Sequence, residues 1–186
     1  MILDIEEISR LYEIRGASTY IKSPLTHLQH ALQCAWLAEQ SGSAHELIAA
    51  ALLHDLGHLL ACYGEQLPPD ADDGHDYIPV PFLRGRFPDA VIEPIRLHVE
   101  ATRHLCGIDS DYWSRLPDTD KRCLARQGGP FTGQQSAVFL ARPFAADALR
   151  VRRWDELAQD PHARPPAWSH FADVLRQVSR HQIAAC

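Results

Sequence analysis

The amino-acid sequence predicts an all-α fold. Apolar residues recur at helical spacing in one segment after another, and no stretch shows the apolar–polar alternation that is typical of a half-buried strand. Several segments begin with residues that cap helices, and turns containing glycine or proline separate them. With 186 residues, 46% of them hydrophobic, the chain is long enough to bury a substantial core. We therefore expect a single all-α domain over residues 1–186.

The first two helices are defined by their ends. Residues 4–15 form an amphipathic segment, and Gly16 follows it in a C-cap position. Ser23 and Pro24 read as an N-cap followed by proline at the first helical position, so a second helix is expected from Pro24 to near Gly42.

The third helix carries the most unusual stretch of the chain. Ser43 and Glu46 match a capping box and are expected to open a helix containing AALLHDLGHLL, residues 50–60. A polar loop rich in helix breakers, residues 64–74, follows.

Proline and glycine also set the elements of the second half. Pro88 is expected to start a helix that reaches about Leu105, with Pro94 kinking it or shifting its start. The remaining expected elements are two short helices flanking Pro117, a turn at residues 127–130, a capping box of Thr132 with Gln135, a helix over 143–158, a Pro-rich connector over 160–167 and a C-terminal helix over 168–182.

Composition excludes several classes of function. A net charge of −6 with pI near 6.0 argues against binding to nucleic acid. The longest apolar run, Leu47 to Leu53, is too short to span a bilayer, and the acidic start lacks the basic region of a secretory signal. Five scattered cysteines without a CxxC pair suit reduced thiols. We expect a cytoplasmic protein that binds neither nucleic acid nor membrane.

Three ionisable residues interrupt the apolar stretch at residues 50–60. In a continuous helix His54 and His58 would share one face, with Asp55 beside them. A single histidine there would most often be a surface or satisfied core residue. Three such groups in five positions instead indicate metal ligands, because buried charges need partners.

Other candidates lie in distant segments with helical or near-helical patterns. They are His30, His75, His98 and Asp155. No cysteine accompanies these positions, so we expect nitrogen and oxygen ligands, which disfavours structural zinc and allows iron, manganese, cobalt or magnesium. Six groups exceed what one catalytic metal needs, and they suit two metals that share a bridging carboxylate.

The order of these residues resembles a known signature. His30, His54-Asp55 and Asp155 are similar to the H…HD…D pattern of the HD-domain superfamily. Longer strings resemble a narrower branch, the mixed-valent di-iron oxygenases that degrade organophosphonates and are relatives of myo-inositol oxygenase. The matching strings, over about residues 17–158, are Tyr20 ten residues before His30, LQHALQCAWLAEQSG, AALLHDLGH, HD followed by FLRG, LHVEATRHL, LARQGGP and VRRWDE.

The resemblance implies a fold, a cofactor and a reaction. The fold would be a compact HD-domain helical bundle with a dinuclear metal site at its centre. One iron would be held by His30, His54, Asp55 and Asp155, and the other by His75, His98 and the shared Asp55. Tyr20 would be a labile ligand of the second iron. The Fe(II)/Fe(III) pair would use O2 to oxidise the hydroxyl-bearing carbon of a 1-hydroxyalkylphosphonate, with C–P cleavage and release of phosphate.

Substrate contacts follow partly from the residues themselves. His58 would donate a hydrogen bond to a bound anion, and Arg152, three residues before Asp155, offers a planar fork that fits phosphonate oxygens; the alternative is a solvated arginine. Asp55 and His58 are the candidate catalytic residues.

Three positions depart from the family pattern. Ser23 replaces a glutamate suited to an ammonium group, Thr102 replaces a lysine, and Asp120 replaces a serine that lines the anion pocket. Asp120 would repel a phosphonate unless it pairs with an arginine or a substrate cation.

Three alternatives to phosphonate cleavage stay open. The same di-iron chemistry could act on a different small hydroxylated molecule. A metal-dependent phosphohydrolase would use the H…HD…D core without Tyr20, and a non-catalytic sensor would retain the metal site alone. In each case the bound ligand is a small molecule, which a sensor would use to regulate a partner, and the protein is expected to be a monomer or small homo-oligomer.

Overall fold

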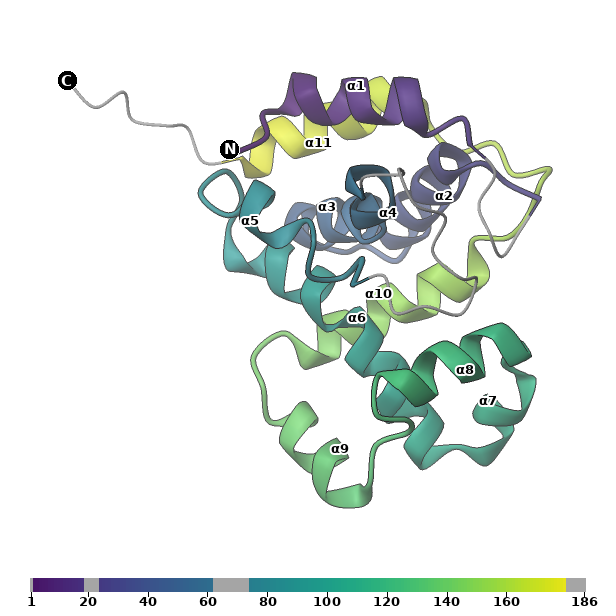
Figure 1. Ribbon diagram of the computed structural model, residues 1–186. Helices are drawn as coiled ribbons and strands as arrows, with labels where there is room; N and C mark the ends of the chain where they lie inside the picture. Colours follow the sequence, from purple (N-terminus) through teal and green to yellow (C-terminus); the bar gives the residue numbers. More distant parts are fainter. Residues whose placement is uncertain (1, 19–23, 62–73, 180–186) are drawn as a thin grey trace.

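The computed structural model describes residues 2–18, 24–61 and 74–179. The described residues form eleven helices and no strand, which confirms the all-α prediction (Figure 1). The helices are α1 (Ile5–Arg15), α2 (His27–Gln40), α3 (His45–Leu53), α4 (Leu56–Leu60), α5 (Val80–Leu83), α6 (Asp89–Ile108), α7 (Ser110–Arg115), α8 (Asp118–Arg126), α9 (Gly133–Leu140), α10 (Ala145–Leu157) and α11 (Trp168–Val178).

The main core surrounds α3. Every residue of this helix from Leu47 to Leu53 is buried, so α3 is apolar on all sides and takes the central position. Helices α2, α6, α10 and α11 pack against it, and α1 lies alongside α11 at one end of the molecule (Figure 1). The indole nitrogen of Trp168 donates to Ser9 Oγ at 2.9 Å and so ties α11 to α1.

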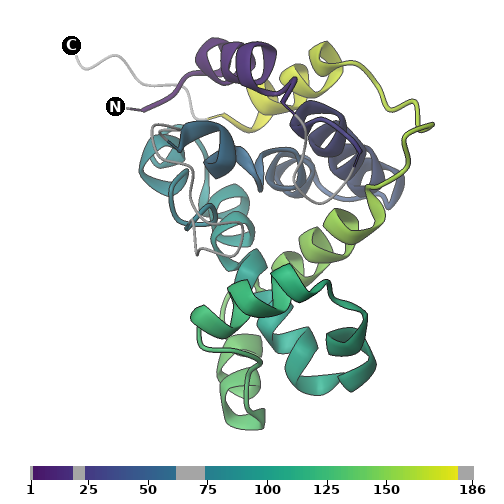
Figure 2. The same cartoon turned by 45° about the vertical axis from the view of Figure 1, so that its right-hand side comes forward.

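Helices α6 and α10 join this core to a second group of helices. The N-terminal part of α6 packs in the main core, whereas Leu97 and Ala101 pack with Phe131 and Phe139 beneath α9. Farther along α6, Cys106 contributes to a small cluster with α7 and α8. Helices α7, α8 and α9 accordingly lie together at the opposite end from α1 and α11 (Figure 2).

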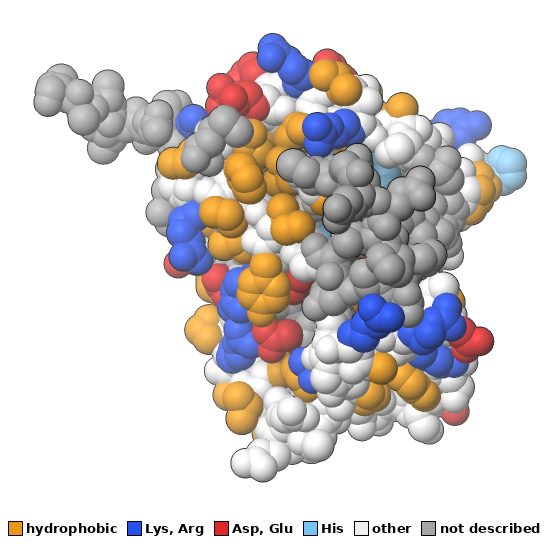
Figure 3. Space-filling view, viewed as in Figure 1, with side chains coloured by type: hydrophobic (Ala, Val, Ile, Leu, Met, Phe, Trp, Pro, Cys, Tyr) orange, Lys and Arg blue, Asp and Glu red, His pale blue; other side chains and the backbone are white. Residues whose placement is uncertain are grey.

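The surface agrees with the charge pattern of the sequence. On the face shown in Figure 3, Lys and Arg side chains are interspersed with acidic and apolar ones, so its described part carries no continuous basic stripe. Within the described residues, no helix combines the length and the apolar character that a membrane span requires.

Two predicted helix starts are wrong. Helix α2 begins at His27 rather than at Pro24, because Thr26 forms a reciprocal capping box with Gln29. Ser23, the predicted cap, lies outside the described residues.

The capping box predicted at Ser43 and Glu46 does not form. Ala44 is the N-cap of α3 and makes no side-chain cap bond. The hydroxyl of Ser43 instead lies 2.8 Å from that of Ser41 and accepts a hydrogen bond from Arg150 at 2.7 Å.

The single helix predicted over residues 50–60 is also wrong. Helix α3 ends at Leu53, Asp55 takes φ −98° and ψ 11°, and α4 starts at Leu56. The backbone of His75 lies so close to Gly57 that a Cβ there would be 2.0 Å from the His75 carbonyl oxygen. The break therefore sits where a distant segment packs against the chain.

Several local predictions are confirmed. Helices α7 and α8 flank Pro117, and Thr132 forms its capping box with Gln135. Gly128 and Gly129 turn the chain with φ of +98° and +70°. The shifted start predicted from Pro94 is not found, because α6 runs from Asp89 to Ile108 with Pro94 inside it. Helix α11 ends at Val178, four residues before the predicted end, and residues 64–73 of the predicted polar loop lie outside the described residues.

Candidate metal centre

The predicted ligands converge from five parts of the fold. His30 comes from α2, His54 and Asp55 from the α3–α4 junction, His75 from the segment before α5, His98 from α6 and Asp155 from α10. All but His75 are buried. Tyr20, the predicted labile ligand, lies outside the described residues.

One group consists of His30, His54, Asp55 and Asp155. One potential ligand atom from each lies within 4.8 Å of those of the other three. His30 Nε2 is 3.2 Å from Asp155 Oδ1, and His54 Nε2 is 3.4 Å from Asp55 Oδ1. These donors form a compact nitrogen and oxygen set.

A second group also includes Asp55. Asp55, His58 and His75 also place ligand atoms within 4.8 Å of one another. The Nε2 atoms of His75 and His98 are 3.0 Å apart, and they lie 3.9 and 4.0 Å from Asp55 Oδ1. The structure therefore brings together all six predicted ligands, with Asp55 common to both groups.

Backbone carbonyls orient three of the imidazole rings. Nδ1 of His30 donates to the carbonyl of Ala158 at 3.0 Å, that of His54 to Ala51 at 2.9 Å, and that of His98 to Ile95 at 2.6 Å. Each bond fixes Nδ1 as a protonated nitrogen and directs Nε2 toward the other ligands, as is typical of metal-binding histidine.

Two atoms of the cluster show that a cation fits there. His54 Nε2 and Asp55 Oδ2 are buried and have no hydrogen-bond partner. Such atoms carry a desolvation cost that metal coordination offsets. The residues present therefore fit a metal with nitrogen and oxygen ligands.

The pKa values of the ligands in the cluster shift in both directions. Burial opposes a charge on Asp55, but His54 and His58 nearby outweigh it and hold the pKa of this carboxyl well below its usual range. Burial and the adjacent His75 lower the pKa of His98 to about 3. Burial is outweighed at two other ligands, because Cys34 and Asp155 raise the pKa of His30 to about 11 and Asp55 and Asp155 raise that of His54 to about 9. Since metals bind a neutral imidazole, an ion would have to displace a proton from each of these two rings.

Arg152 is buried against acidic residues. Its guanidinium contacts Asp155 Oδ2 through Nη1, lies 3.0 Å from Glu156 through Nη2, and donates through Nε to Tyr112 Oη at 3.0 Å. The alternative of a solvated arginine is therefore wrong. Because Arg152 contacts Oδ2, Oδ1 of Asp155 is left to face His30.

A cavity of about 350 Å³ adjoins the cluster at Asp155. Arg152 and Asp120, two of the predicted substrate contacts, both line it. The full lining is Tyr112, Arg115, Leu116, Pro117, Asp120, Arg152, Asp155, Glu156 and Gln159.

The other predicted contacts lie elsewhere. His58 stacks on His75 with ring centroids 4.3 Å apart, which places it beside the second group of ligands. Thr102 is buried on α6 and its hydroxyl donates to the carbonyl of His98 at 3.2 Å, so it does not line the cavity described above. Ser23 lies outside the described residues.

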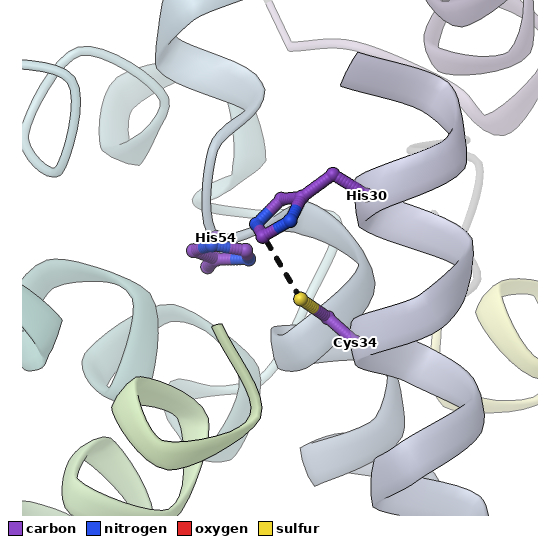
Figure 4. A group of neighbouring side chains, drawn as sticks. All are labelled: His30, Cys34 and His54. Atoms are coloured by element: carbon purple, nitrogen blue, oxygen red, sulfur yellow. Dashed lines mark hydrogen bonds between the residues drawn. The ribbon is translucent and has the colours of Figure 1, made fainter. Parts of the chain in front are cut away.

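Sequence reasoning missed two residues of this region. The prediction that no cysteine accompanies the ligands is wrong, because the buried Cys34 places Sγ 3.5 Å from His30 Nε2 (Figure 4). The i, i+4 spacing of His30 and Cys34 was the available signal. Gly57, inside the HDLGH string, was the other residue missed, because its role depends on the approach of His75.

Comparisons with known proteins identify the class. No protein-family model matches the chain. The chain is 41% identical to the hydroxymethylphosphonate dioxygenase of Gimesia maris over 181 residues, which cover 95% of this chain and 90% of that protein. It is 34% identical to the [1-hydroxy-2-(trimethylamino)ethyl]phosphonate dioxygenase (glycine-betaine-forming) of Leisingera caerulea over 182 residues, covering 97% and 93%.

Fold, site and relatives together define a helical, metal-binding oxygenase. The chain belongs to the phosphonate-degrading branch of the HD-domain oxygenases.

Proposed function

We propose that this oxygenase converts a small 1-hydroxyalkylphosphonate with O2, cleaving the C–P bond and releasing phosphate. The names of the two relatives support this class of substrate. The observation that carries the proposal is the position of Asp55 between two groups of histidines, because a reaction with a pair of metals needs a carboxylate that both can share.

Two irons, in the Fe(II)/Fe(III) state, are the proposed cofactor. His30, His54, Asp55 and Asp155 would hold one iron, and His75, His98 and Asp55 the other. Asp55 fits the shared role because Oδ2 lies 3.8 Å from His30 Nε2 while Oδ1 faces His54, His75 and His98. When bound, the irons would supply the O2 chemistry that oxidises the hydroxyl-bearing carbon of the substrate.

The chain's own residues would bind and orient the substrate. Arg152 lines the cavity next to Asp155 and offers a cation to a phosphonate, while it also holds Asp155 in place. His58 lies beside the second group of ligands and can donate a hydrogen bond to the anion. Asp120 and Glu156 add negative charge to the cavity wall, which favours a substrate with a cationic substituent.

The test measures phosphate release and O2 consumption by the iron-loaded protein. Hydroxymethylphosphonate and [1-hydroxy-2-(trimethylamino)ethyl]phosphonate are supplied in air and under anaerobic conditions. We expect phosphate in air, with equal O2 consumption, and none without O2. Phosphate release that continues without O2 would reject the oxygenase reaction. Oxygen consumption with a non-phosphonate alcohol, and with neither phosphonate, would reject the substrate class.

Asp120→Asn should affect activity on the two phosphonates differently in the same assay. Because Asp120 would face a substrate cation, its neutral variant should lose activity on the trimethylamino compound about tenfold, roughly the effect of 1.4 kcal/mol, relative to hydroxymethylphosphonate. Arg153→Met, at an exposed neighbour of Arg152, is the control and should leave the ratio unchanged.

A further inference from the structure

Cys34 is a sulfur donor inside the candidate metal centre. Its side chain is 0% exposed and lies one helical turn after His30, on the face of α2 that looks toward the α3–α4 junction (Figure 4). Sγ of Cys34 and ring nitrogens of His30 and His54 all lie within 4.8 Å of one another. The three residues therefore form a mixed nitrogen and sulfur group.

The spacing of these donors fits a tetrahedral ion. With metal–nitrogen distances of about 2.0 Å and a metal–sulfur distance of about 2.3 Å, nitrogen and sulfur ligands of zinc stand roughly 3.5 Å apart. The observed distance from His30 Nε2 to Cys34 Sγ is 3.5 Å. Asp155 belongs to the adjoining group that uses the same two histidines, with Oδ1 3.2 Å from His30 Nε2 and 3.8 Å from His54 Nε2.

His54 supplies an independent indication of a ligand. Its ring is 0% exposed, and Nε2 has no hydrogen-bond partner although it faces the other donors. A buried imidazole nitrogen in that state is stabilised by a cation. Soft thiolate together with imidazole favours zinc or cobalt over the harder ions that prefer oxygen alone.

We propose that His30, Cys34 and His54 form a site for a thiophilic divalent ion, zinc or cobalt, that overlaps the first iron position. This inference rests on the proposed function, which names iron as the metal that would be displaced. Both sets share His30 and His54, so an ion held through Cys34 takes two of the ligands that iron needs. Binding releases the thiol proton to solvent, since the thiolate is the ligand.

Cobalt(II) is the probe that tests this site. It is titrated into the full-length, metal-free protein while the absorption spectrum is recorded. We expect a near-ultraviolet thiolate-to-cobalt charge-transfer band that saturates at one cobalt per chain and disappears when zinc is added. Cys34→Ser should lose the band and keep the visible cobalt bands, because His30, His54 and Asp155 remain. Cys106→Ser, at another buried cysteine, is the matched control and should keep both.

Each outcome separates this inference from the proposed function. Visible cobalt bands without a charge-transfer band in the wild-type protein would overturn the sulfur site, and this spectrum needs no variant to fold. Loss of the band in Cys106→Ser, with its retention in Cys34→Ser, would also overturn it. The O2-dependent release of phosphate is measured on iron-loaded protein, so it can fail while the sulfur site holds, or succeed while the sulfur site is refuted.

Discussion

At the scale of single residues, the candidate centre depends on two residues that are not predicted metal ligands but that position the ligands. Gly57 allows the backbone of His75 to approach the α3–α4 junction, and Arg152 fixes one oxygen of Asp155. Neither role is visible in the sequence, because each is defined by a contact with a residue far away or by the direction of a side chain. Both can be tested without a substrate.

Gly57→Ala should disrupt the second group of ligands. A Cβ at this position would meet the His75 carbonyl oxygen at 2.0 Å, so the backbone of His75 must move away from Asp55. We expect the variant to lose about 1–3 kcal/mol of stability and to bind about half the iron of the wild-type protein, measured by denaturant unfolding and elemental analysis. Gly133→Ala is the control, since a Cβ there meets nothing within 4 Å. Full iron content in Gly57→Ala would contradict this role.

Arg152→Met should lower the free energy of unfolding, because it leaves a buried carboxylate without its counter-charge. Asp155 would remain in the interior without its main counter-charge, which destabilises the metal-free protein by about 3–5 kcal/mol. Denaturant unfolding of Arg152→Met, Asp155→Asn and the double variant measures the coupling between the two residues. The double variant should be more stable than the sum of the single losses implies, whereas simple additivity would show that the pair is not coupled.

At the scale of elements, helices defined by local sequence signals were predictable, whereas a helix break that depends on a tertiary contact was not. The short helices around Pro117 and the capping box at Thr132 were predictable because each depends on residues a few positions apart. The break between α3 and α4 was not, because the apolar pattern of residues 50–60 continues through it. The break depends on the segment that brings His75 against Gly57, so a continuous pattern alone predicted the wrong element there.

The start of α2 connects a helix cap to the candidate centre. Thr26 caps the helix whose first turn carries His30, and Thr132 forms the same type of capping box at α9. Replacing either threonine by alanine should cost about 1 kcal/mol, measured by unfolding. Only Thr26→Ala should also weaken metal binding, because fraying of the first turn of α2 displaces His30. An equal loss of metal affinity in Thr132→Ala would contradict this link.

At the scale of the whole molecule, α6 and α10 connect two regions that a substrate would need together. Helix α10 carries Asp155 in the ligand cluster and also Arg152 and Glu156 in the adjoining cavity. Helix α6 supplies His98 to the cluster, and α7 and α8, which follow it, wall the cavity with Tyr112 and Asp120. The site therefore lies where the central core meets the α7–α9 end of the molecule.

The sequence predicted the components of the candidate centre better than their arrangement. Helical periodicity predicted the fold class, and buried ionisable residues predicted that a cluster would form. The division of the ligands between two metals came from the family resemblance, since spacing along the chain cannot show which of His30, His75 and His98 faces which side of Asp55. Cys34 was missed because an apolar helix face explains a buried cysteine equally well.

The central claim is that two irons share Asp55. It is tested most directly by electron paramagnetic resonance of the iron-loaded, partly reduced protein, with and without the two hydroxyphosphonates. The account predicts a signal from a coupled Fe(II)/Fe(III) pair, changed by the compound that the enzyme converts and absent from His98→Ala. A spectrum that contains only isolated ferric iron in the wild-type protein, and that neither compound alters, would contradict it.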